Sequence, residues 1–204
     1  MCPHCLGRAL PFAALLIVAL LVVSIGAQVR PSRQDAEAMK RKVATIQAHG
    51  EQSSKQPRRT TVTESEVNSY IAYELNGTLP EGVVNPSVMA PGEGRVSGRA
   101  VVDLDAVRKA GKSTGLLDLR SYLTGSVPVA ATGVIHASNG VGRFELESAT
   151  VGGVPIPKWL LQEIISHYSK SPEHPAGISL DDPFELPARI REIQVQRGLA
   201  VVVQ

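Results

Sequence analysis

The most constraining feature of this chain is an uninterrupted apolar segment close to its start. Residues 9–29 are 21 consecutive uncharged residues between Arg8 and Arg30. About 20 apolar residues in a row can cross the hydrocarbon core of a bilayer as a helix. The same segment, with one basic residue before it and small residues at its end, also fits a secretory signal peptide. Residues 1–29 are therefore predicted to be a signal anchor or a signal peptide, and both interpretations bring the chain to a membrane.

Basic residues lie mainly after this segment. Five of them fall between residues 30 and 42, whereas only Arg8 precedes the segment. The positive-inside rule, taken alone, would keep the C-terminal side in the cytoplasm. The signal-like features favour export instead. We expect a membrane-anchored or exported protein with its domain on the extracytoplasmic side, and the charge asymmetry is the observation that opposes this placement.

The overall composition excludes several classes of protein. Of the 204 residues, 43% are hydrophobic and 4% are aromatic, and the formal net charge is +2. A chain this apolar and weakly charged is unlike a disordered protein. It also lacks the strong basic field and the aromatic platforms with which proteins hold nucleic acid, so no nucleic-acid partner is expected.

Charge divides the rest of the chain into two parts. Residues 30–59 carry 8 Lys or Arg against 3 acidic residues, a balance of +5, and residues 60–204 carry 12 against 16, a balance of −4. The basic part contains a predicted helix over 33–48 and is interpreted as a basic helical spacer or linker. In one interpretation this part is a solvated spacer. In the other, its basic side chains are attracted to anionic lipid headgroups. The acidic part is predicted to be one domain.

This domain, residues 60–204, shows signals for two helices and several antiparallel strands. A capping box from Thr63 to Glu66 begins one amphipathic helix, and Pro157 fits the first position of a second. Alternating apolar residues and an Asn-Gly turn predict strands and hairpins over 95–105, 126–138, 141–151 and 189–204. The predicted fold is α+β, with a curved, mostly antiparallel sheet packed on two amphipathic helices after the apolar membrane segment and the basic spacer.

One short motif matches part of an enzyme signature. Residues 111–115 read Gly-Lys-Ser-Thr-Gly, with Asp118 and His136 downstream, as in a serine hydrolase. The residues before the motif are polar and helix-like, whereas a nucleophile elbow follows a buried strand. The leading glycine of a phosphate-binding loop is also replaced, by Ala106. The chain is predicted not to be an enzyme and to use no cofactor or metal, and a serine hydrolase with Ser113 as nucleophile is a distant third interpretation.

Small residues recur on the predicted inward face of the strands. Because dry protein interiors are close-packed, something must fill the space above these residues. In one interpretation the helix after Pro157 lies directly on them. In the other, an apolar groove stays partly open and takes an acyl chain, with a gain of about 0.8 kcal/mol for each buried methylene. The residues are Gly98, Ala100, Ala131, Gly133 and Ala137.

Three motifs carry a resemblance to a known family. They are Thr63-Glu64-Ser65-Glu66-Val67-Asn68, the segment Val151–Pro157 with the helix that follows, and Ile193-Gln194-Val195-Gln196 with Gly198. In this order the chain resembles small bacterial envelope members of the TULIP-like (tubular lipid-binding) superfamily, over about residues 60–204. The resemblance implies a highly curved sheet around a long helix, a lipid-sized apolar cavity and no catalytic residues. The chain is short for a two-module lipid tunnel, and only one module would fit.

The sequence therefore predicts a non-enzymatic module that binds, and in one version transfers, an acyl-chain lipid in an apolar groove. Membrane lipid is the expected partner, with an envelope protein as a second one. The alternative is an envelope scaffold or assembly protein with a fully packed core and no ligand. The residues predicted to line the groove are Val67, Ile71, Phe144, Leu146, Trp159, Leu160, Ile164 and Tyr168.

Overall fold

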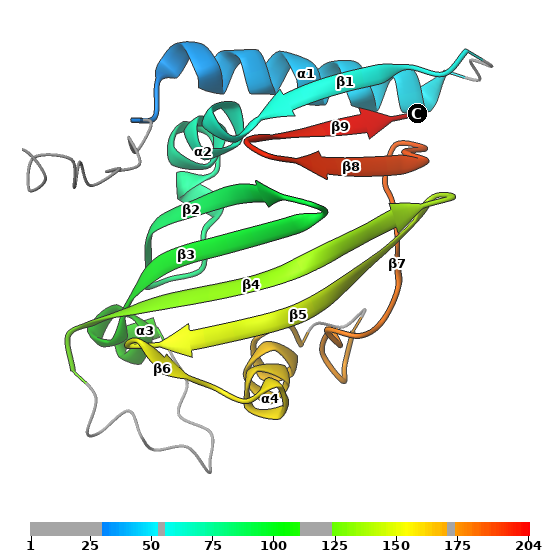
Figure 1. Cartoon of the computed structure of the whole chain (residues 1–204). Helices are drawn as coiled ribbons and strands as arrows, with labels where there is room; N and C mark the ends of the chain where they lie inside the picture. Colours follow the sequence, from blue (N-terminus) through cyan, green and yellow to red (C-terminus); the bar gives the residue numbers. More distant parts are fainter. Residues whose placement is uncertain (1–29, 53–55, 111–123, 171–173) are drawn as a thin grey trace, which may run out of the picture.

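The computed structural model describes residues 30–52, 56–110, 124–170 and 174–204, which form an α+β fold with two antiparallel sheets (Figure 1). The predicted fold class is confirmed at this level. The predicted membrane segment 1–29 and the Ser113 motif lie outside the described residues. Among the described helices, none combines the length and the apolar character that a membrane span requires.

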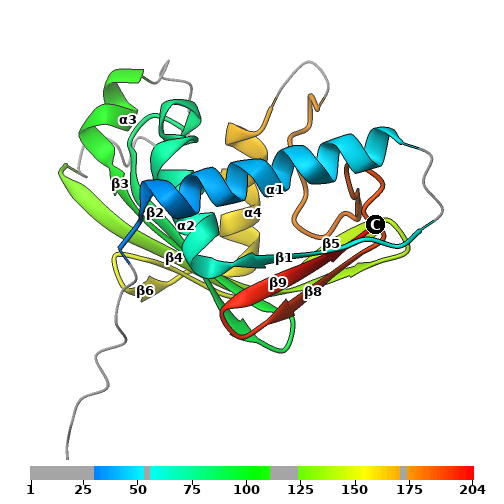
Figure 2. The same cartoon turned by 90° about the horizontal axis from the view of Figure 1, so that it is seen from above.

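The larger sheet has the strand order β2-β3-β4-β5-β6, with β7 paired to β5, and the smaller sheet has the order β1-β9-β8. The helices α1, α2 and α4 lie on one side of the strands (Figure 2). The helices and strands are α1 (Arg33–Glu51), β1 (Arg59–Thr63), α2 (Glu64–Tyr73), η2 (Asn76–Thr78), β2 (Val83–Gly92), β3 (Arg95–Asp103), α3 (Leu104–Ala110), β4 (Ser126–Ser138), β5 (Val141–Val151), β6 (Val154–Pro155), α4 (Lys158–Tyr168), β7 (Phe184–Glu185), β8 (Glu192–Gln196) and β9 (Leu199–Val203).

The hairpin of β4 and β5 forms where the Asn-Gly signal predicts it. Asn139 has a φ of 54° and Gly140 a φ of 81°. Two consecutive positive φ values are typical of the tight turn whose twist matches that of the strands. The turn pairs Ser138 with Val141 and so sets the register of the two longest strands.

The two sheets are joined through the tips of their hairpins. The backbone N–H of Gly94, at the β2–β3 turn, donates to the Val195 carbonyl of β8 over 3.1 Å, and the N–H of Gly198, at the β8–β9 turn, donates to the Ala90 carbonyl over 2.9 Å. At the β4–β5 turn, the N–H of Gly140 donates to the Arg191 carbonyl over 3.0 Å. These contacts hold the smaller sheet against one end of the larger one.

Helix α1 packs against α2 and β1, a packing that the spacer interpretation of residues 30–59 did not anticipate. Its N-cap is Ser32, whose hydroxyl accepts from the Asp35 N–H, and whose own N–H donates to the Ser69 hydroxyl over 3.0 Å. The helix also contributes Ile46 to the main buried apolar cluster. The cluster consists of Ile46, Ala137, Leu186, Ile190 and Val202.

A carboxylate lies buried between α1 and α2. Lys42 Nζ of α1 donates to both oxygens of Glu66 over 2.6 and 2.7 Å, and the Thr63 N–H donates to Glu66 Oε2 over 2.8 Å. Burial acts to raise the pKa of Glu66, but the hydrogen bonds from Lys42 and Thr63 outweigh it, so the pKa lies below its usual 4.5. The capping box predicted for this helix is thereby confirmed and extended to α1.

Asp35 is a second carboxylate at the same interface whose pKa is lowered by hydrogen bonds. The Ser65 hydroxyl donates to Asp35 Oδ2 over 2.7 Å. Hydrogen bonds from Ser65 and Ser32 lower the pKa of Asp35 from its usual 3.8. Both carboxyls thus favour the charged form when the chain is folded.

Acid is therefore expected to destabilise the fold through this interface. Because the pKa of each carboxyl is lower in the folded than in the unfolded chain, its stabilisation is complete above its unfolded value and is lost as the pH falls through the folded value. The melting temperature should decline below about pH 4.5, as measured by circular dichroism. In Glu66→Gln, which cannot ionise, that decline should be shallower. A melting temperature that rises on acidification would contradict the expectation.

Candidate functional site

The small inward residues form a row across the larger sheet. The register pairs Gly98 of β3 with Ala131 of β4, and Ala131 with Ala149 of β5. Residues paired side by side in a sheet share a face. The row runs across three strands, and Val88 of β2 continues it opposite Gly98.

The space above this face is open at one end and filled at the other. A Cβ atom built on Gly98 would have no other heavy atom within 4 Å. At Gly133 the same atom would lie 2.5 Å from the Phe144 ring and also against the Glu145 carbonyl. The Phe184 ring of β7 lies equally close to Gly142. Rings from neighbouring strands thus fill the space near the β4–β5 turn, and the Gly98 end remains unfilled.

Helix α4 packs on β5 and leaves much of its apolar surface accessible. Leu160 and Ile164 are half-buried, and 69% of Trp159 is exposed. The opposite, polar side of the helix holds the loop at 177–180. Gln162 Nε2 donates to the Ile178 carbonyl over 3.0 Å and Gln162 Oε1 accepts from the Leu180 N–H over 2.7 Å.

The predicted site residues are divided between two regions of the fold. Val67 and Ile71 are half-buried on α2, which packs against α1 and β2. Phe144 and Leu146 are half-buried on β5, beside α4. The remaining four are on α4: Trp159, Leu160, Ile164 and Tyr168, of which the side chain of Tyr168 lies outside the described part.

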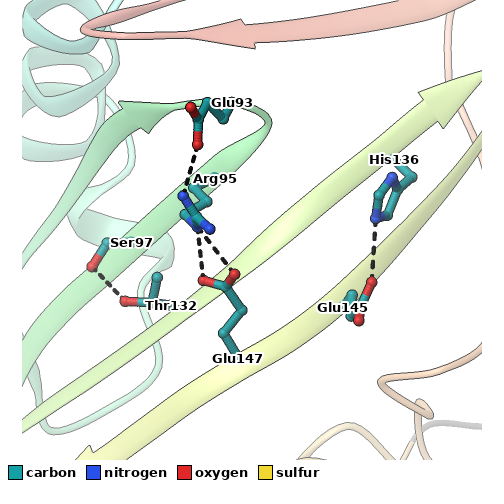
Figure 3. Close-up of polar contacts among 7 residues, drawn as sticks. All are labelled: Glu93, Arg95, Ser97, Thr132, His136, Glu145 and Glu147. Carbon is teal, nitrogen blue, oxygen red and sulfur yellow. Dashed lines mark hydrogen bonds and ion pairs between the residues drawn. The ribbon is translucent and has the colours of Figure 1, made fainter.

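The other face of the larger sheet carries a line of paired polar side chains (Figure 3). Arg95 donates to Glu147 over 3.0 and 3.2 Å and to Glu93 over 3.0 Å. Glu147 can reach across β4 because a bulge opposite Thr132 and Gly133 leaves it without a strand partner. The hydrogen bond with Glu147 and its charge raise the pKa of Arg95. Both side chains are more than a third exposed, so this bridge is a surface ion pair.

The hydrolase interpretation involves one residue on this face. His136 Nε2 lies 3.3 Å from Glu145 Oε2 and is exposed. Ser113 and Asp118, the other two members of that triad, lie outside the described residues. Within the described ranges, no three or more His, Cys, Asp or Glu side chains are placed to hold a metal ion.

The predicted site residues line neither of two hollows on the described surface. One of about 340 Å³ lies beside the β4–β5 turn and Arg191. The other, of about 380 Å³, lies between α1 and the start of β1. We call the second one the basic groove, and its polar lining includes Arg41, Lys42, Thr45, Arg58, Arg59 and Thr61.

Comparison with known proteins gives little. No family model matches the chain, and no curated protein matches it. Among solved structures, a crystal structure of lipopolysaccharide binding protein aligns with a TM-score of 0.22 and 14% identity, over 72% of this chain and 40% of that one. The chain thus spans less than half of that protein. Since so low a TM-score establishes no common fold, the TULIP-like assignment stays a prediction from the sequence.

Proposed function

We propose that this protein is a membrane-anchored or exported module that binds an acyl-chain lipid on the apolar face of its larger sheet, between the strands and α4. The proposal rests on the open space above Gly98. A methylene chain laid beside Gly98 and Ala131, which are half-buried, would bury apolar surface on both partners. Each methylene would contribute about 0.8 kcal/mol without any polar contact.

The partial exposure of the surrounding side chains supports the same conclusion. Val96, Val129 and Leu146 flank the row on the same face and are half-buried rather than fully buried. Trp159 and Val154 are exposed, by 69% and 64%, at the connection between β6 and α4. Large exposed apolar side chains near one another are typical of surfaces that meet a ligand, a protein or a membrane.

The scaffold alternative requires a free strand edge; one of the edges, that of β2, is covered. Asn68 of α2 donates to the Val88 carbonyl over 2.8 Å and accepts from the Val88 N–H over 2.7 Å. Glu64 accepts from the Ala90 N–H over 3.0 Å. These side chains take the positions that a partner strand would occupy, so β2 is a poor docking edge.

Filling the space above Gly98 is expected to weaken lipid binding. In Gly98→Leu the Cβ atom would meet no heavy atom within 4 Å, and the rest of the side chain would occupy the volume of at least two methylenes. We therefore expect affinity for a fluorescent fatty acid to fall about tenfold. Binding is measured by probe displacement on the purified full chain. Mass spectrometry of its organic extract identifies the co-purifying lipid.

The matched control is Gly77→Leu. A Cβ atom at Gly77 also has no neighbour within 4 Å, but the residue lies in the exposed turn η2, away from the sheet. This variant should bind the probe as the unmodified chain does. Absence of any bound lipid or probe in the unmodified chain, or equal affinity in Gly98→Leu, would refute the proposal.

A further inference from the structure

The basic groove gathers positive charge in a chain whose residues 60–204 are acidic on balance. Helix α1 contributes Arg41 and Lys42, and the start of β1 contributes Arg58 and Arg59. Thr45, Thr60 and Thr61 also line the groove. Arginine forks with neighbouring hydroxyl donors match the oxygen geometry of a phosphate group.

The basic residues that line this groove differ in whether a carboxylate already pairs with them. Lys42 is held by Glu66 at 2.6 Å, and Arg41 lies 4.0 Å from Glu37 in an exposed pair. Arg58 and Arg59 have no ion-pair partner within the part of the chain that the structure describes. Arg58 shares the sheet face of Thr60, which pairs with Val202 and so faces α1, whereas the side chain of Arg59 starts on the opposite face. The guanidinium of Arg58 is thus the one placed to meet an anion in the groove.

The backbone of β1 adds donors at the same place. β1 is an edge strand of the smaller sheet. Arg58 and Gln204 exchange both backbone hydrogen bonds, over 3.1 and 2.9 Å. Because bonded and non-bonded pairs alternate along an antiparallel ladder, the N–H groups of Arg59 and Thr61 face away from β9, toward the free edge.

We propose that the basic groove is a binding site for a phosphate group, held by the Arg58 guanidinium and the free backbone N–H groups of Arg59 and Thr61, with Arg41 opposite. Its volume of about 380 Å³ exceeds a phosphate ion and suits a headgroup-sized ligand. The favoured source is an anionic phospholipid. Arg41 is eight residues into α1 from Arg33, about 12 Å along the helix, and the predicted membrane segment ends at residue 29.

The test uses the full chain in micelles of an uncharged detergent. Inorganic phosphate and short-chain phosphatidylglycerol are titrated separately and followed by calorimetry. In Arg58→Gln/Arg59→Gln the affinity for phosphatidylglycerol should fall at least tenfold. The matched control is Arg99→Gln/Arg143→Gln, which removes two exposed arginines from the opposite surface of the larger sheet and the same net charge. Its affinity should change less than twofold.

The two titrations separate the sources of the phosphate group. Binding of phosphatidylglycerol alone supports a headgroup site, and equal binding of inorganic phosphate supports a site for the free ion in the same groove. Failure of both ligands to bind, or equal losses in the two double variants, would overturn the proposal. These substitutions do not touch the apolar face of the larger sheet. The Gly98→Leu experiment therefore tests the proposed acyl-chain site independently of the basic groove.

Discussion

Replacing Glu66 with alanine is expected to lower the free energy of unfolding by about 3 kcal/mol. The substitution leaves the Thr63 N–H and the Lys42 ammonium without their acceptor in a site where only 11% of the Glu66 side chain is exposed. It also removes one half of the capping box that begins α2. Urea unfolding followed by circular dichroism measures the loss.

A glutamate on the exposed side of the same helix pair supplies the control. Glu37 of α1 is 69% exposed, 4.0 Å from Arg41, and such surface pairs contribute little. Glu37→Ala should therefore change the free energy of unfolding by less than about 0.5 kcal/mol. Similar losses in the two variants would show that α1 does not depend on Glu66 for its attachment.

Replacing Gly133 with valine is expected to cost about 2–3 kcal/mol for a different reason. Its first carbon would lie 2.5 Å from the Phe144 ring and press on the Glu145 carbonyl of the paired strand. Either the ring leaves its place over the sheet or β4 and β5 separate locally. Gly77→Val, at a position with no neighbour within 4 Å, should change the unfolding midpoint little. An unchanged midpoint in Gly133→Val would mean that Phe144 does not fill this part of the face.

Local signals in the sequence predicted much of the fold. The Asn139-Gly140 turn and the Thr63–Glu66 capping box are short-range features, and both form as expected. The second amphipathic helix also forms, although Pro157 is its N-cap rather than its first residue. These features depend on neighbours a few residues apart, which is why periodicity and turn chemistry reveal them.

The packing of α1 could not be predicted in the same way. Its many charged residues are typical of a solvated helix, and only Ala36 and Ile46 are buried. The partners that fix the helix, Glu66 and Gln204, are 24 and 158 residues away from the groups they bind. Likewise, the alignment of Gly98 with Ala131 and Ala149 depends on the register and the bulge of β4 and β5. The basic groove requires both α1 and β1 to be in place.

The attachment of Ser32 to Ser69 determines how far the anchored form can reach. The predicted apolar segment ends at residue 29, so about three residues, spanning no more than roughly 10 Å, separate it from a point fixed to the body of the protein. A connection this short would not let the anchored domain reach a second membrane. In the anchored form the module would work beside the bilayer that holds it, and any acceptor would have to come to that surface.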